Sequence, residues 1–126
     1  MNSGPVVSET FSRDDRLRKR REFEECYASG VRISGRYIQV FLLAGLSSGR
    51  PRLGISVPRR VGDSVARNRV RRRLREIFRR HRPLLPACAL SLVINARPSA
   101  ADAAFTDLLE DYRAGVARAL SRLPLP

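Results

Sequence analysis

The chain has 126 residues, of which 43% are hydrophobic, and it carries a formal net charge of +13 at pH 7. This length and hydrophobic fraction predict one domain with a modest core and exclude a disordered polycation. The charge indicates a polyanionic partner, either a nucleic acid or an anionic membrane surface. A membrane is disfavoured, because no apolar run approaches the roughly 20 residues of a spanning helix and the first residues lack a signal-peptide pattern, so we expect a cytoplasmic protein.

The N-terminal part predicts a leader followed by a helix. Residues 1–15 contain Gly, Pro and Ser without a hydrophobic period, so we expect a flexible leader, then a domain at 16–123 and a tail at 124–126. Residues 16–28 predict a short helix with Phe23, Cys26 and Tyr27 on one face. Spacing alone favours core packing for both rings, but the basic residues one turn earlier leave base stacking open.

Three strands are expected next, over 31–33, 36–44 and 52–57. Aliphatic residues alternate toward the core, which leaves Phe41, Gly54 and Ser56 on the other face. The small residues there predict a shallow trough beside Phe41, suited to a single strand of nucleic acid. Alternatively, Gly54 lets a helix or another backbone approach closely.

The most basic stretch follows. From Arg59 to Arg82 there are eleven arginines and two acids, a net charge of +9. Residues 64–82 predict a helix capped by Asp63 or Ser64 and ended by Pro83. One helical stripe is apolar and is expected to face the core: Ala66, Val70, Leu74, Ile77 and Phe78. The opposite side is polar and almost free of acids: Asn68, Arg72, Arg75 and Arg79. A solvated charged surface usually carries both signs, so nucleic-acid binding is favoured.

The C-terminal part predicts a buried strand at 89–95 and a final helix that Pro98 and Ser99 open, with Ser99 and Asp102 as a capping box. The expected order is α-β-β-β-α-β-α. This order indicates a single α+β domain with a four-stranded, mostly antiparallel sheet and helices packed on it.

The sequence offers no set of catalytic residues. A nuclease needs paired carboxylates for metal ions or a His acting as acid and base, but the acids are scattered and His81 stands alone among arginines. Cys26 and Cys88 lie in separate elements, so we expect buried thiols, no disulfide and no zinc site. We therefore expect a binding protein with no catalytic residue and no metal site of its own.

Three stretches resemble one protein family. The run GISVPRRVGDSVARNRVRRRLREIF, with Arg67-Asn68-Arg69 at its centre, is similar to the signature of the bacterial ribonuclease P protein subunit. The runs LRKRREFEECYASGVRISGRYIQVFLL and LVINARPSA extend the resemblance over about residues 17–120. The resemblance implies a fold like that of ribosomal protein S5, with a left-handed βαβ crossover. It also implies a function: the protein binds a catalytic RNA that, with Mg²⁺, removes the 5′ leader of precursor tRNA, and catalysis belongs to the RNA.

The resemblance implies two groups of binding residues. The catalytic RNA is expected to contact the basic helix, which also helps recruit metal ions, through Arg67, Asn68, Arg69, Arg71, Arg72 and Arg75. The leader of precursor tRNA is expected in a central cleft formed by Phe23, Tyr27, Arg36, Phe41, Ser56, Arg59 and Arg60. The family often has Lys where this chain has Arg, and this change preserves phosphate binding.

Two other functions remain as alternatives. One is a ribosomal or ribosome-assembly protein that coats structured RNA without any role in cleavage. The other is a DNA-binding module, which is disfavoured because Asn68 alone on the basic face is a short polar side chain able to read bases. We therefore expect RNA partners and no DNA.

Overall fold

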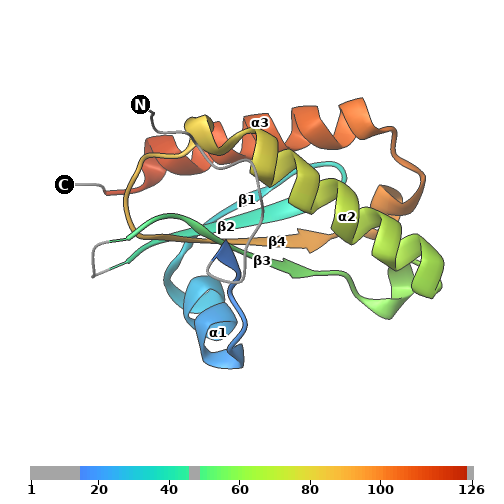
Figure 1. Ribbon diagram of the computed structural model, residues 1–126, viewed down its shortest axis with the longest axis horizontal. Coiled ribbons are helices and arrows are strands. Elements are labelled where there is room, and N and C mark those ends of the chain that lie inside the picture. Colours follow the sequence, from blue (N-terminus) through green and yellow to red (C-terminus); the bar gives the residue numbers. More distant parts are fainter. Residues whose placement is uncertain (1–14, 46–48, 125–126) are drawn as a thin grey trace, which may run out of the picture.

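The computed structural model describes residues 15–45 and 49–124, and these form three helices and four strands (Figure 1). The elements are α1 (Arg20–Ser29), β1 (Val31–Ser34), β2 (Ile38–Ala44), β3 (Arg52–Ser56), α2 (Ser64–Arg80), β4 (Leu90–Ala96) and α3 (Phe105–Arg122). Short 3-10 turns span Arg59–Val61, Arg82–Leu84 and Pro98–Asp102. The predicted order of helices and strands is confirmed. The predicted leader lies outside the described residues except for Asp15, which is buried and so does not belong to a flexible segment.

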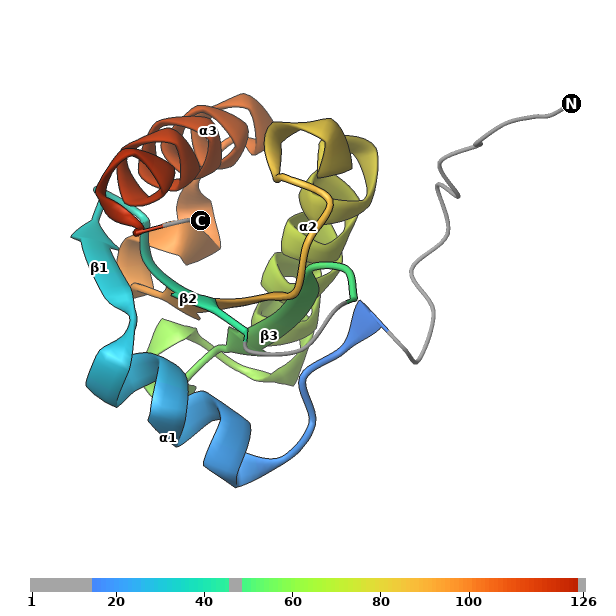
Figure 2. The same ribbon diagram turned by 90° about the vertical axis from the view of Figure 1, so that its left-hand side faces the viewer.

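The four strands form one mixed sheet in the order β1-β2-β4-β3. β2 is antiparallel to both β1 and β4, whereas β3 and β4 run parallel and are joined through α2. In Figure 2 these two strands point away from the viewer, and the chain rises from β3 into α2 and descends into β4 on the left of β3. The crossover is therefore left-handed, the hand that about 98% of such connections avoid.

The helices cover the sheet unequally. α2 and α3 lie on one face and α1 lies on the other (Figure 2). The main core fills the space under α2 and α3, where Ile38, Val40 and Leu42 of β2 meet Leu74 and Tyr112. The predicted apolar stripe of α2 is buried in this core, apart from the half-buried Ala66. As a result, the opposite side of α2 is held outward.

A smaller core lies between α1 and the sheet. It contains Leu17, Cys26, Phe41 and Val93, with Phe23 packed against them. Burial raises the pKa of the Cys26 thiol to about 11. Cys88 is only half-buried, and both cysteines are free thiols.

The first helix begins later than the sequence predicts. Residues 16–19 are extended, and α1 starts at Arg20 because the Glu22 carboxylate accepts the backbone N–H groups of Lys19 and Arg18, at 3.2 and 3.3 Å. Burial acts to raise the pKa of Glu22, but its hydrogen bonds with Arg52 and with these N–H groups hold that pKa below its ordinary value. This carboxylate thus fixes where the extended segment ends.

The last helix also begins later than predicted. Pro98–Asp102 is a separate 3-10 turn, and α3 starts at Phe105 after Ala104, with no side-chain cap. The predicted capping box is wrong, because the Ser99 hydroxyl donates to the carbonyl oxygen of Arg36, 2.9 Å away. Ser99 therefore ties the turn after β4 to the turn before β2.

Asp111 of α3 fixes the turn between β1 and β2. Its carboxylate accepts the backbone N–H groups of Tyr37 and Ile38, at 2.9 and 3.0 Å, and that of Arg36 at 3.3 Å. A Cβ atom at Gly35 would lie 2.6 Å from the Asp111 Oδ2 atom, so a glycine is needed for this close approach. The Asp111 carboxylate therefore joins α3 to the β1–β2 hairpin.

We expect Asp111→Ala to lower the free energy of unfolding by about 2 kcal/mol, because three N–H groups lose a charged acceptor. Urea denaturation followed by circular dichroism measures the change. Glu110→Ala removes an exposed carboxylate from the same helix and serves as the control. Equal stability of the two variants would contradict the structural role of Asp111.

Candidate nucleic-acid interface

The basic helix is fixed at its start and along its buried side. The Asp63 carboxylate accepts the backbone N–H of Ala66 at 2.9 Å, which confirms the predicted cap. Val70 and Leu74 are almost fully buried beneath the helix. These contacts hold α2 in one orientation, so its outward side chains start from a rigid backbone.

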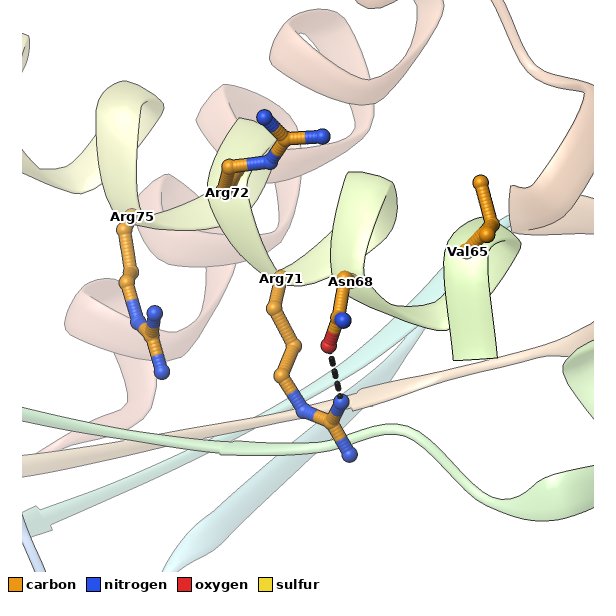
Figure 3. A pocket seen from close by; sticks show the side chains of 5 residues that line it. All are labelled: Val65, Asn68, Arg71, Arg72 and Arg75. Carbon is orange, nitrogen blue, oxygen red and sulfur yellow. Dashed lines mark hydrogen bonds between the residues drawn. The ribbon is translucent and has the colours of Figure 1, made fainter. Parts of the chain in front are cut away.

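Five residues of α2 line one groove of about 650 Å³, which we call the α2 groove: Val65, Asn68, Arg71, Arg72 and Arg75. Arg71 and Arg75 extend to the same side of the helix and Arg72 extends to the other (Figure 3). The Asn68 side-chain oxygen accepts a hydrogen bond from Arg71 Nη1 at 3.0 Å, which orients that guanidinium (Figure 3). The structure therefore brings together four of the six helix residues expected to bind RNA.

The other arginines of α2 have different surroundings. Arg69 is exposed but does not line the α2 groove. Arg67 is half-buried, and its Nε atom donates to the carbonyl oxygen of Val57 at 3.2 Å. Arg73 Nη1 donates to the carbonyl oxygen of Ala103 at 2.9 Å, an anchoring role that the sequence did not indicate. The Nε atom of Arg67 is thus bound to the protein's own backbone.

The acid at the end of α2 binds its neighbours. Arg79 bonds both carboxylate oxygens of Glu76, at 3.1 and 2.6 Å, and Arg80 pairs with the same group. These partners, Arg79 first, hold the pKa of Glu76 below its ordinary value. The charge of the last turn is therefore partly compensated, whereas the groove-lining arginines lie one to three turns earlier.

A second polar surface lies on the sheet face that carries α1. One residue from each strand stands side by side in a row across the sheet, and we call these four the polar row: Ser34, Gln39, Asn95 and Ser56. Gln39 Nε2 donates to Ser34 Oγ at 3.2 Å. The Tyr27 hydroxyl donates to Asn95 Oδ1 at 2.9 Å, which joins α1 to the row. Sequence reasoning missed Asn95, although its alternation with the buried residues of β4 placed it on this face.

The three predicted aromatic residues differ in exposure: Tyr27 is exposed, Phe23 is half-buried and Phe41 is buried. The Tyr27 side chain is 39% exposed and meets Phe41 edge to face, with 4.8 Å between ring centroids. Phe41 is only 7% exposed, and the expected trough beside it is wrong because α1 covers this part of the sheet. A Cβ atom at Gly54 would lie 2.6 Å from the ring of Phe23. The alternative for Gly54, close approach of a helix, is confirmed, and Phe41 supports Tyr27 from beneath.

The remaining predicted residues are three exposed arginines. Arg59 and Arg60 are exposed on the 3-10 turn that follows Ser56. Arg36 is exposed, and its guanidinium carbon lies 5.4 Å from the ring centroid of Tyr37. Arg59 and Arg60 therefore provide positive charge near the Ser56 end of the polar row, whereas Arg36 lies over Tyr37.

The chemistry of these surfaces suits anions. Guanidinium groups donate forked hydrogen bonds that match phosphate oxygens, and they cannot act as ligands of a cation. Within the described residues, no group of three or more His, Cys, Asp or Glu side chains is arranged to hold a metal ion. In the same residues, we find no helix with the length and apolar character needed to cross a bilayer.

Comparisons with known proteins agree on one family. A family model described as Ribonuclease P matches residues 11–120. The chain is similar to the ribonuclease P protein component of Acidothermus cellulolyticus, with 39% identity over 98 residues that cover 77% of this chain and 81% of the relative. For the same component of Desulfovibrio desulfuricans the identity is 44% over 90 residues, covering 71% and 68%. The solved structure of the RNase P protein from Thermotoga maritima superimposes with a TM-score of 0.73 at 29% identity, covering 82% and 96%.

Proposed function

The chain belongs to the bacterial ribonuclease P protein family, and we propose that it acts by binding both the catalytic RNA of that enzyme and the 5′ leader of precursor tRNA. Membership implies a part in the maturation of tRNA 5′ ends within an endoribonuclease complex.

The observation that carries the proposal is the α2 groove. Its three arginines stand on a helix whose other side is buried, so the backbone that carries them does not have to become ordered when RNA binds. Arg71 is further oriented by Asn68. A rigid, forked set of donors suits the closely spaced phosphates of a folded RNA. We propose that the catalytic RNA binds here, with Arg67 and Arg69 contacting it at the margins.

The polar row and Tyr27 are proposed to bind the leader. An unpaired base can stack on an exposed aromatic ring, and amide and hydroxyl groups beside it can reach the edge of that base. Arg36, Arg59 and Arg60 supply phosphate contacts at the margins. Phe23 and Phe41 act from beneath by holding Tyr27 and α1 in place.

We propose that cleavage itself is performed by the RNA. The α2 groove offers guanidinium donors where bound Mg²⁺ would need oxygen ligands, and its one side-chain oxygen, on Asn68, already accepts a hydrogen bond from Arg71, so the residues of this groove do not fit the ion. The Mg²⁺ ions of the reaction are proposed to be held by RNA. The protein contributes by binding, by orienting the leader and by neutralising phosphate repulsion between two RNAs.

Reconstitution tests this function. The protein is added to a bacterial ribonuclease P RNA at a Mg²⁺ concentration too low for the RNA alone, and cleavage of precursor tRNA is followed on a gel. We expect 5′ processing to be restored, because the arginines offset the repulsion that Mg²⁺ otherwise screens.

Protein without RNA is the control and is expected to leave the precursor intact at every Mg²⁺ concentration. Tight RNA binding without any gain in cleavage would instead favour the ribosome-assembly alternative. Cleavage by the protein alone would refute the assignment of catalysis to the RNA.

A further inference from the structure

Residues Asp15–Arg18 lie along the outer edge of β3, and we call this segment the strap. Arg16 pairs with Leu53 in parallel orientation, and the backbone N–H of Leu17 donates to the carbonyl oxygen of Leu53 at 2.9 Å. The Leu17 side chain is 5% exposed and belongs to the small core under α1. The strap is therefore part of the fold, and its path places Arg16 and Arg18 beside the sheet.

The Asp15 carboxylate holds the start of the strap. Asp15 is 1% exposed, and its two oxygens lie 2.8 and 3.3 Å from the terminal nitrogens of Arg82. Arg50 Nε lies 3.1 Å from Oδ1 of the same carboxylate. Arg82 follows α2 and Arg50 precedes β3, so one buried anion joins three distant segments. A buried carboxylate with two cationic partners keeps its position far better than an exposed pair does.

The strap completes a groove of about 190 Å³ against α2, which we call the strap groove. Half of its lining is cationic and half is apolar: Arg16, Arg18, Arg71 and Arg75, with Leu17, Phe23, Leu53 and Ile55. Arg71 and Arg75 also line the α2 groove, so the two grooves are neighbours that share these two side chains. The apolar wall limits water on one side, which strengthens charge interactions inside.

The arginines of the strap groove are crowded. Burial, and then the charges of Arg16 and Arg71, lower the pKa of Arg75. Like charges held at close range cost free energy, and an anion placed among them removes that cost. The strap itself contributes one of the two charges that act on Arg75.

We propose that the strap groove binds a phosphate group of RNA through Arg16, Arg18 and Arg75, and that Asp15 is the positioning residue for this contact. The inference rests on the proposed RNA-binding function and deepens it. The phosphate continues the path of the RNA that occupies the α2 groove, through the shared Arg71 and Arg75.

Asp15→Asn tests the positioning role, because it adds one positive charge to the protein. If net charge alone governed binding, affinity for RNA would rise. We expect it to fall roughly tenfold, because a strap without its anion no longer holds two phosphate-binding arginines in place. The slope of log Kd against log salt should decrease by about 1.5 for these two contacts. Glu25→Gln makes the same change of charge at an exposed site of α1 and should cause no loss.

Arg16→Gln/Arg18→Gln is the second variant, because both side chains are exposed and their replacement removes neither Arg50 nor Arg82 from the Asp15 carboxylate. Its control is Arg113→Gln/Arg118→Gln on α3, which removes the same charge elsewhere. Circular dichroism at the assay temperature measures the folded fraction of each variant. Asp15→Glu, which keeps the negative charge, should recover part of the slope of log Kd against log salt. A purely structural role for Asp15 would change the folded fraction and leave the slope of the folded protein unchanged.

Binding is measured to bacterial ribonuclease P RNA alone, to precursor tRNA with a leader and to mature tRNA. If the strap variants lose affinity only for ribonuclease P RNA, the phosphate belongs to the catalytic RNA. If they lose affinity only for precursor tRNA, the phosphate belongs to the leader. Unchanged Kd and slope in both strap variants would overturn the inference while the wild-type protein still binds and restores processing. Absence of RNA binding by the wild type would instead refute the proposed function.

Discussion

Replacing Arg71, Arg72 and Arg75 together with glutamine is expected to weaken binding of ribonuclease P RNA about 100-fold or more. Hydrogen bonds to charged groups contribute roughly 1.5–3 kcal/mol each, and the lower value applies where solvent screens the partners. Each lost phosphate contact also removes about 0.7–0.9 from the slope of log Kd against log salt, so the triple variant should lose about 2 to 3. Filter binding over a range of salt concentrations measures both quantities.

A matched control separates position from net charge. Arg113, Arg118 and Arg122 are exposed on α3, and their replacement with glutamine removes the same three charges. This control should lose little affinity, because long-range attraction between exposed charges is screened within about 10 Å at ordinary salt. Similar losses in both triple variants would mean that the α2 groove has no special place in RNA binding.

Replacing Tyr27 with alanine is expected to remove much of the preference for precursor tRNA over mature tRNA. Stacking of a base on an aromatic ring contributes about 1–3 kcal/mol, which corresponds to roughly 5- to 150-fold in affinity. Only the leader-bearing RNA should suffer this loss, because the mature tRNA has no unpaired 5′ segment to stack. Binding of both RNAs to the reconstituted enzyme measures the difference.

Tyr27→Phe is the matched control for the ring itself. It keeps the aromatic face and the contact with Phe41, and it removes the hydrogen bond to Asn95. If stacking dominates, this variant should bind the leader nearly as well as the wild type. Equal losses for precursor and mature tRNA in Tyr27→Ala would show that Tyr27 acts by packing alone. Phe41→Ala is a poorer test, because that ring is buried and its loss destabilises the small core.

The sequence predicted the basic helix well because two strong periodic signals coincide there. Val70, Leu74 and Phe78 recur at helical spacing, and burial of that stripe determines where Asn68 and Arg72 point. The start and the end of this helix could also be predicted, because the cap at Asp63 and the effect of Pro83 on the residues before it depend only on neighbouring residues. The arrangement of the α2 groove followed from these features.

Features that depend on distant segments could not be predicted in the same way. Ser99 looked like a helix cap, but a carbonyl group 63 residues away takes its hydrogen bond. Phe41 looked available for stacking because alternation places it on the outer face, and only the position of α1 shows that this face is covered. Asp15 seemed to belong to a flexible leader, and its partners Arg50 and Arg82 lie far along the chain. No local pattern encodes such pairings.

The parallel bridge between Arg16 and Leu53 has a consequence for the behaviour of the molecule in solution. β3 is the last strand on its side of the sheet, and an uncovered border of this kind invites strand pairing between separate molecules. The segment at Arg16 and Leu17 occupies part of that border with backbone of the same chain. The strap, which supplies cations to the strap groove, therefore also discourages self-association. A shortened chain that begins at α1 would lose both these cations and the protection of the β3 edge.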